Sequence, residues 1–372
     1  MLRNYWIIAG ALVSIAAVLF LLTGWHLSAP ERTLERFEQA IRENKAEKLQ
    51  GLMISADKKT AFDRNAAGGL LLYLKEEKDV FTEAMHALKK EIREGSFDSD
   101  AVLTLTPSDK FLFFFTTYRV KIKPQMIMVS GLQEGDRLSL KLEGHTVPQT
   151  KEKDRFGPVF PGKYRLEKFL TNELGLFVKK EQIALWGDEV TVQADTAQWV
   201  RSDPTFQKQV MASVHQFNAE VSEWETADYH PDKLPSATEI FRMQQSQSRM
   251  AQFATIRTHL EAIESSYLGM TVNLDSIEIS RYGGRWNASI ETVVSYKYVY
   301  WIKGDSHMYD DSYQRGVVFR MIWEAETRQW LIHGMDDTWE TEEAAKKWTH
   351  KEKIRVQKPE VSRWQSEKGA NL

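Results

Sequence analysis

Four acid–base side chains near the C-terminus are the residues of this sequence that come closest to catalytic chemistry. His307, His333, Asp336 and Asp337 fall between or inside runs of alternating apolar residues, and a pocket enzyme needs such a group as its general acid or base. His333 is the most tempting because it lies inside a strand pattern. A strand histidine is more often a hydrogen-bonded structural residue, however, and no spacing pairs it with a second group. The sequence therefore predicts no catalytic residue.

Signals for nucleophiles and metal ligands are equally weak. Ser55 and Lys58 have the S-x-x-K spacing of some acyl-transferring serine enzymes. The partner motifs S-D-N and K-T-G are absent from the sequence, so we interpret the pair as a turn between helices. No H-E-x-x-H pattern occurs and the chain has no cysteine, which removes disulfides, thiol catalysis and cysteine-ligated zinc. We expect neither a metal nor a cofactor.

Aromatic residues in the same region fit binding better than catalysis. They cluster around the predicted loop 303–311, where many amphipathic rings suit a sugar or a peptide. The plainer interpretation is a packed core, because an aromatic stripe at every second position is usual for a buried strand. The predicted ligand-binding residues are Tyr298, Tyr300, Trp301, Tyr309, Tyr313, Arg315 and His333. Which strand faces are concave, and whether the interior is open, stays undecided.

The elements that hold these residues are predicted to be two helices followed by a curved meander of strands. The first helix begins at Pro204, and its apolar residues recur every three or four positions up to Trp224. A second helix follows, with apolar residues in register as far as Ile263. Gly283-Gly284 predicts a hairpin. The predicted strands are 272–282, 285–302, 312–325 and 329–335. This order predicts an α+β cone over 202–340.

Two further modules precede the cone. Apolar residues at helical spacing predict a small all-α module over 28–95. The period then changes to two, as in the stretches around Val120 and Leu140, which predicts a small β-sandwich module over 108–197. The run from Phe111 to Phe115 is too apolar for a solvated strand. We expect it to pack at the interface between the two modules, and contact with a membrane is the alternative.

One stretch near the N-terminus indicates the cellular location of the protein. Residues 6–25 are apolar, carry no charge and are flanked by tryptophans, which predicts a transmembrane helix that crosses the roughly 30 Å core of a bilayer. A cleaved signal peptide is the alternative, but the site around Ala29 is poor and Pro30 follows it. We therefore expect an uncleaved signal anchor, with residues 1–5 in the cytoplasm and the rest outside the cell membrane. Nearby basic residues do not favour this orientation by themselves, but long domains translocate largely regardless of charge.

Charge excludes one class of partner and indicates another. A formal net charge of -3 and a pI near 6.4 give no bias toward nucleic acid. Residues 341–372 are rich in lysine and arginine and poor in apolar residues, so we predict a basic flexible tail. Such a tail would meet anionic wall polymers or lipid head groups, or would stay solvated without a partner.

Four short segments, in this order, resemble one family. They are Leu70-Leu71-Leu72-Tyr73-Leu74-Lys75, Ala87-Leu88-Lys89-Lys90, Tyr118-Arg119-Val120-Lys121 and Gly157-Pro158-Val159-Phe160-Pro161-Gly162-Lys163-Tyr164. With the membrane anchor, they resemble the teicoplanin-resistance-associated (TcaA-like) membrane proteins of Gram-positive bacteria. The resemblance implies a bitopic envelope protein in cell-wall homeostasis or glycopeptide response that ends in an NTF2-like domain, and it supplies no catalytic residue. Relatives typically begin with a cysteine zinc ribbon and can carry the β module twice. This sequence shows neither feature, so a zinc-linked cytoplasmic role is not carried over.

Three classes of function stay open. The favoured one is a non-catalytic binding or scaffold protein whose extracytoplasmic modules hold a peptidoglycan precursor, an anionic wall polymer or an envelope partner. A pocket enzyme acting on a small envelope substrate would need a charged group inside the cone. A sensor would need a membrane-protein partner, because residues 1–5 are too short to signal alone. The ligand and the oligomeric state stay undecided.

Overall fold

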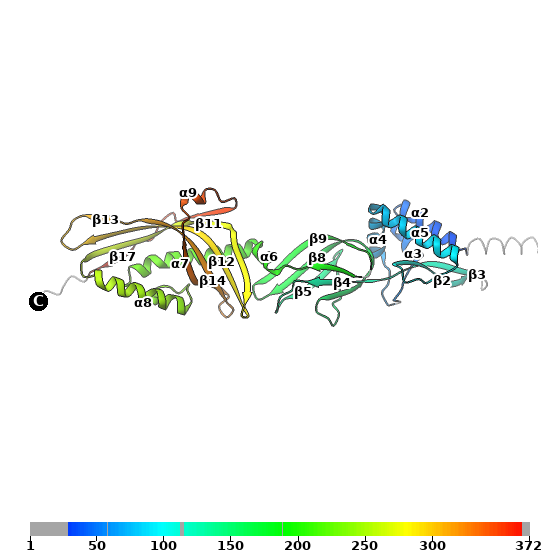
Figure 1. Ribbon diagram of the computed structural model, residues 1–372, viewed down its shortest axis with the longest axis horizontal. Helices are drawn as coiled ribbons and strands as arrows, with labels where there is room; N and C mark the ends of the chain where they lie inside the picture. Colours follow the sequence, from blue (N-terminus) through cyan, green and yellow to red (C-terminus); the bar gives the residue numbers. More distant parts are fainter. Residues whose placement is uncertain (1–28, 58, 112–114, 188, 367–372) are drawn as a thin grey trace, which may run out of the picture. The chain divides into compact units, whose positions relative to one another are not determined.

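The computed structural model of the protein describes residues 29–366, apart from residues 58, 112–114 and 188 (Figure 1). The chain divides into two units, Met1–Ala194 and Asp195–Leu372, which are described separately. The predicted transmembrane helix at 6–25 and cytoplasmic residues 1–5 lie outside the described residues, as do Lys58 and the centre of the run 111–115. In the part of the chain that is described, no helix is long and apolar enough to cross a membrane.

Four helices and a small sheet form the first part of unit one. The helices are α2 (Pro30–Arg42), α3 (Ala46–Leu52), α4 (Arg64–Glu76) and α5 (Lys78–Glu94). The strands are β1 (Met53–Ser55), β2 (Leu103–Phe111) and β3 (Phe115–Ile122), in the order β1-β3-β2. α2 begins at Pro30, whose fixed φ suits the first helical position. Asp63 caps α4 by accepting a hydrogen bond from the backbone N–H of Ala66.

The N-terminal part is helical, as predicted, but it is not all-α, because strands complete its core. Leu103 and Leu105 on β2, with Val120 and Ile122 on β3, are buried in one cluster with Leu70 and its neighbours on the helices. A strand with one apolar face must bury that face against another element, and here the helices cover it. The predicted start of the β module at residue 108 accordingly falls inside β2.

Two more sheets complete unit one. One has the order β10-β4-β7 and contains β4 (Gln125–Ser130), β7 (Arg155–Val159) and β10 (Glu189–Gln193). The other has the order β6-β5-β8-β9 and contains β5 (Arg137–Leu142), β6 (His145–Val147), β8 (Gly162–Asn172) and β9 (Gly175–Leu185). Leu138, Leu140 and Leu142 are buried along β5 while the residues between them are more exposed, as the alternation predicts. This part of the chain is therefore rich in β-strands, as expected.

In unit two, helices cover one face of a long curved sheet (Figure 1). The helices are α6 (Thr196–Arg201), α7 (Pro204–Glu225), the short 3-10 helix η1 (Pro231–Lys233) and α8 (Glu239–Ile256). The main strands are β11 (Leu260–Tyr282), β12 (Arg285–Ile302), β14 (Tyr313–Glu324) and β15 (Gln329–Thr338), in the order β15-β14-β12-β11, while β13 (Met308–Asp310) pairs with β12. Gly283 and Gly284 both have positive φ and form the predicted hairpin between β11 and β12. The α+β order predicted for this region is thus confirmed.

β11 begins earlier than the sequence pattern predicts. The second helix ends at Ile256, and Leu260 and Ile263 belong to β11 although their spacing continues the helical register. Both side chains are buried against Phe253 of α8. The eighteen residues of β12 offer pairing partners back to Ile302, so long-range pairing extends β11 over a segment that is locally ambiguous.

The C-terminal segment is not the flexible tail that its composition predicts. After α9 (Glu342–Ala345), the strands β16 (Lys351–Arg355) and β17 (Ser362–Gln365) pair antiparallel with β11. Gly269 permits this approach, because a Cβ at that position would lie 2.2 Å from the backbone oxygen of Ile354. Backbone pairing with the open edge of β11 therefore orders a segment whose side chains alone bury little surface.

Candidate functional site

A cavity of about 450 Å³ opens between α7, α8 and the strands β12, β14 and β15. α7 contributes Phe217, Val221 and Trp224, which share one helix face because they are four and three residues apart. The complete lining is Phe217, Val221, Trp224, Glu225, Tyr229, Leu234, Gln245, Arg249, Tyr298, Asp311, Tyr313, Arg315, Met335 and Asp337. Apolar and polar side chains therefore share the wall of this opening, which we call the cone cavity.

Glu225, the last residue of α7, places a carboxylate in the wall of the cone cavity. It accepts hydrogen bonds from Ser265 Oγ at 2.6 Å and from Tyr313 Oη at 3.3 Å. Burial raises the pKa of Glu225 above its ordinary value, and the hydrogen bonds from Ser265 and Tyr313 oppose this effect only in part. The protein therefore favours the protonated form of this carboxyl group more than water does.

Three tyrosines surround this carboxyl group. Burial raises the pKa of Tyr229, Tyr298 and Tyr313 above the ordinary phenol value, so all three keep their protons at neutral pH. The ring of Tyr313 stacks on that of Tyr296 at 5.1 Å. Tyr296 is fully buried and donates a hydrogen bond to Asn218 Oδ1 at 2.6 Å, which fixes the base of the stack on α7. The hydroxyl groups thus stand on rigid, packed rings.

Arg315 brings a positive charge to the same wall. Its Nη1 lies 3.5 Å from Oδ1 of Asp337 on the neighbouring strand β15. The buried Nε–H of Arg315 has no hydrogen-bond acceptor among the described residues. A buried donor without an acceptor is costly, and this one belongs to a residue that lines the cone cavity. The donor is therefore available to a bound group.

The structure brings together part of the predicted set of binding residues. Tyr298, Tyr313 and Arg315 line the cone cavity. Tyr300 and Tyr309 stack on each other beside it, with ring centroids 5.2 Å apart and nearly parallel planes. Tyr300 also packs against the cluster of Phe253, Leu260 and Ile263 that closes this end of the cone. Ligand binding by these residues stays a prediction.

Trp301 and His333 lie apart from the cone cavity. Strand alternation turns Trp301 to the face opposite Tyr300, where the guanidinium carbon of Arg363 lies 5.8 Å from its ring centroid. His333 is the extra residue of a β-bulge, since Gly334 pairs with Arg320 whereas Ile332 pairs with Met321. Its exposed ring is hydrogen-bonded through Nδ1 to Thr238 Oγ1 at 3.1 Å. Because it follows the buried Ile332, the His333 side chain lies on the exposed face of β15, away from the cone cavity.

The remaining acid–base residues do not form a catalytic group. His307 is exposed and packs edge-on against Tyr309, while Asp336 pairs with Arg320 at 3.1 Å on the outside of the sheet. Of the four residues first suspected, only Asp337 reaches the cone cavity. Among the described residues, no group of three or more histidine, aspartate and glutamate side chains is arranged to hold a metal ion.

Glu225, Tyr229 and Arg249 are among the lining residues that sequence reasoning missed. The signal for Glu225 was present, because it follows Val221 by four residues and so continues the apolar stripe of α7 with a carboxylate. Tyr229 has a left-handed backbone in the turn after α7, and that conformation carries no clear sequence signal. Arg249 lies on α8, whose orientation over the sheet is a tertiary property.

These features define an NTF2-like cone with a polar cavity, and comparison with known proteins agrees. Residues 210–336 match the family described as the YvbJ NTF2-like domain, and residues 30–122 match the family described as the TcaA protein second domain. With the uncharacterized membrane protein YvbJ of Bacillus subtilis (strain 168), the chain is 26% identical over 193 residues. That alignment covers 49% of this chain and 31% of YvbJ, so the chain matches about a third of its relative's length.

These matches confirm the resemblance to TcaA-like membrane proteins that was drawn from the short segments. The relatives' descriptions indicate no catalytic activity, and they support a membrane and cell-envelope location. A solved structure, the intermembrane space region of the chloroplast protein ARC6, is 13% identical and covers 35% of this chain and 95% of that one, with a TM-score of 0.28. That likeness is too low to carry an argument about fold or function.

Proposed function

We propose that this protein is a non-catalytic, single-pass envelope protein whose cone cavity binds a cell-wall component. The observation that carries the proposal is a hydrogen-bond acceptor and a hydrogen-bond donor in one aromatic-lined cavity: the carboxyl group of Glu225 on α7 and the unpartnered Nε–H of Arg315 on β14. A pocket of this kind orients a ligand by a few polar groups while its apolar walls supply contact area. Packed, protonated tyrosines supply that area here.

The ligand that fits this chemistry best is a peptidoglycan fragment or precursor. Its stem peptide carries both ammonium and carboxylate groups, which match Glu225 and Arg315, and its sugars suit the faces of Tyr298 and Tyr313. An anionic wall polymer fits less well, because Glu225, Asp311 and Asp337 share the cavity with only Arg249 and Arg315. A role in cell-wall homeostasis or glycopeptide response would follow from binding of a peptidoglycan fragment.

The location is part of the proposal. The family resemblance and the charge-free stretch at 6–25 support a single-pass protein with its N-terminus in the cytoplasm and its modules outside. Protease added to intact protoplasts should then digest the two units and leave a small membrane fragment. Complete protection of the chain would contradict this orientation.

Binding is tested by calorimetric titration of the full chain, in detergent micelles, with a disaccharide-peptide fragment of peptidoglycan. Tyr298→Ala and Tyr313→Ala should each weaken binding about 30-fold, since truncating a buried aromatic anchor typically costs about 2 kcal/mol. Tyr282→Ala is the matched control, because this tyrosine is 84% exposed on the hairpin between β11 and β12. Unchanged affinity in the two cavity variants would place the site elsewhere.

An enzyme acting on a small envelope substrate is the second candidate, favoured by one observation only. The raised pKa of Glu225 is the property that a general acid needs. Mass spectrometry of the same fragment after incubation with the protein separates the two functions. Binding without any change in the fragment's mass supports the non-catalytic proposal, whereas turnover that Glu225→Gln abolishes supports the enzyme.

A further inference from the structure

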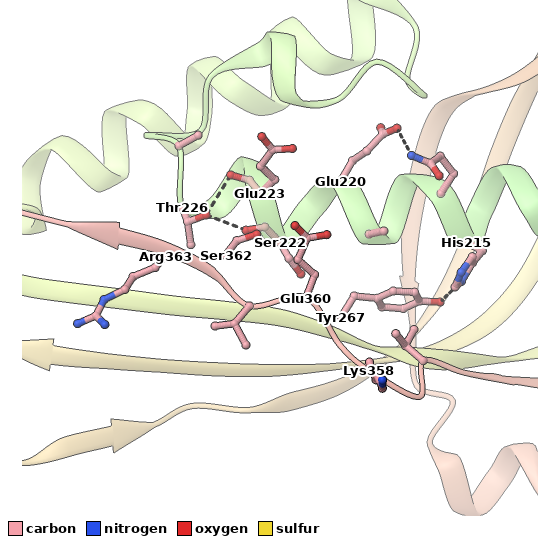
Figure 2. Close-up of a pocket in the computed structure, with 15 residues that line it drawn as sticks. His215, Glu220, Ser222, Glu223, Thr226, Tyr267, Lys358, Glu360, Ser362 and Arg363 are labelled. Atoms are coloured by element: carbon pink, nitrogen blue, oxygen red, sulfur yellow. Dashed lines mark hydrogen bonds between the residues drawn. The ribbon is translucent and has the colours of Figure 1, made fainter.

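A second cavity, of about 630 Å³, lies on the other side of α7 (Figure 2). Its second wall is the segment that joins β16 to β17, residues 356–361, which we call the strap. His215, Ser222 and Thr226 line this cavity from α7. They form a helix stripe roughly opposite the one that lines the cone cavity, since residues 215 and 217 differ by about 200° around a helix. One helix therefore separates two independent cavities.

One buried hydroxyl group of this cavity lacks a partner. Ser222 is 3% exposed, and its Oγ has no hydrogen-bond partner among the described residues. Its neighbours are occupied: Thr226 Oγ1 donates to the backbone oxygens of Ser222 and Glu223, and His215 Nδ1 is 3.2 Å from Tyr267 Oη. An unsatisfied hydroxyl in the wall of a cavity is a group that a ligand can satisfy.

The charge around Ser222 is predominantly negative. Three carboxylates line the cavity, Glu220 and Glu223 from α7 and Glu360 from the strap. Glu220 accepts hydrogen bonds from the N–H and hydroxyl of Ser236, and Glu223 pairs with Lys233. Glu360 has no ion-pair partner among the described residues, and Figure 2 shows its side chain reaching from the strap toward α7.

The positive groups of the lining do not neutralise these carboxylates. Arg363 is turned away from α7 (Figure 2), toward Glu264 at 3.4 Å and over the ring of Trp301. Burial lowers the pKa of His215, so its ring is uncharged at neutral pH. Lys358, exposed on the strap two residues before Glu360, is the remaining cation of the lining. The cavity keeps an excess of negative charge.

We infer that this cavity binds a primary alkylammonium group. The ammonium donates hydrogen bonds to the carboxylate of Glu360 and the hydroxyl oxygen of Ser222, and a short alkyl chain lies against Ala219, Ala227 and Val361. An ammonium offers three donors and no acceptor, which matches a site made of carboxylates and an unpartnered hydroxyl. A lysine-type side chain of a peptide and a free diamine both present this group.

The test is calorimetric titration of the full chain in detergent micelles with two probes, cadaverine and the tripeptide Gly-Lys-Gly. Pentane-1,5-diol, the uncharged counterpart of cadaverine, should not bind. Tighter binding of cadaverine would indicate a free diamine as the natural source, and tighter binding of the tripeptide would indicate a peptide side chain. Failure of both probes to bind, or equal binding of the diol, would overturn the inference.

Two substitutions locate the bound ammonium. Glu360→Gln, on the exposed strap, should weaken binding of the better probe about tenfold, and Ser222→Ala about threefold, because each removes one hydrogen-bond partner. Glu352→Gln is the matched control, since it removes the same charge from an exposed position of β16 outside the cavity. Glu225→Gln distinguishes the two cavities, because Glu225 lines the cone cavity and Glu360 lines this one. Loss of binding in Glu225→Gln with retention in Glu360→Gln would assign the ammonium to the cone cavity and overturn the inference.

Discussion

A buried glutamate in unit one and a half-buried glutamate in unit two show how differently this chain uses the same side chain. Glu91 on α5 accepts hydrogen bonds from Thr104 Oγ1 at 2.7 Å, from the backbone N–H of Leu105 at 2.8 Å and from Ser99 Oγ. Glu225 on α7 has two donors, borders a cavity and has a raised pKa. A buried charge whose partners all come from the chain fixes two elements together, whereas one with partners missing beside a cavity is poised for a ligand.

The largest effect is expected at Glu91. Glu91→Ala removes the acceptor shared by α5 and β2. The N–H of Leu105 then stays buried without this acceptor and Thr104 Oγ1 loses its shortest hydrogen bond, so the free energy of unfolding of unit one should fall by about 3 kcal/mol. Hydrogen exchange of the amides of α5 and β2 measures this loss. If their protection is unchanged, Glu91 does not fix these two elements together and the comparison fails.

At Glu225 the comparison predicts that a substitution stabilises the protein, whereas the substitution of Glu91 destabilises it. Because folding raises the pKa of Glu225, its favourable contribution to stability is complete below its ordinary value of 4.5 and is lost as the pH rises through the folded-state pKa. Glutamine does not titrate, so Glu225→Gln does not lose stability in this way. As the pH rises from 4 to 8, the free energy of unfolding of the variant should therefore increase relative to that of the natural chain. Urea unfolding followed across that range checks it, and a constant difference at every pH would contradict the raised pKa.

Glu225→Gln should also weaken binding of the peptidoglycan fragment about tenfold, since a charge-assisted hydrogen bond is replaced by a neutral one. The same substitution at Glu91 should leave that affinity unchanged. This pair of variants separates the two roles, because one glutamate affects stability alone and the other affects binding.

The smallest effect is expected at His333. His333→Ala removes an exposed ring with one hydrogen bond to Thr238, so the free energy of unfolding should change by no more than about 0.5 kcal/mol and fragment binding should not change. Urea unfolding and calorimetry measure both quantities. A tenfold loss of affinity would mean that the place of His333 on the exposed face of β15 does not exclude this residue from the site.

Local patterns in the sequence predicted the elements of the cone well, because periodicity and turn chemistry are local. Pro204, the apolar stripe to Trp224 and Gly283-Gly284 all hold in the structure. What failed was set by pairing between distant segments. Ile263 joins β11 because β12 is long enough to pair with it, and the C-terminal strands are ordered by the edge of β11 and not by their own apolar content.

For the site, too, local patterns predicted which side chains share a strand face, but not where the cavity lies. Strand alternation groups Tyr298 with Tyr300 and Tyr313 with Arg315, but only the packing of α7 and α8 decides that the cavity opens at Tyr298 and Tyr313. His333 follows the buried Ile332, so strand alternation turns its side chain to the exposed face of β15. Glu225 has a local signal, a carboxylate on an apolar helix stripe, but only the packing of the neighbouring elements shows that a cavity lies beside it.

The most direct measurement of the central claim is the nuclear magnetic resonance spectrum of the tyrosine rings, labelled with carbon-13 in the full chain, during titration with the peptidoglycan fragment. The signals of Tyr298 and Tyr313, assigned by their loss in the corresponding phenylalanine variants, should shift with the fragment concentration and saturate. Tyr118 on β3 of unit one should not shift. If the fragment binds and only tyrosines outside the cone cavity respond, or if no tyrosine responds, the cavity between Glu225 and Arg315 is not the binding site.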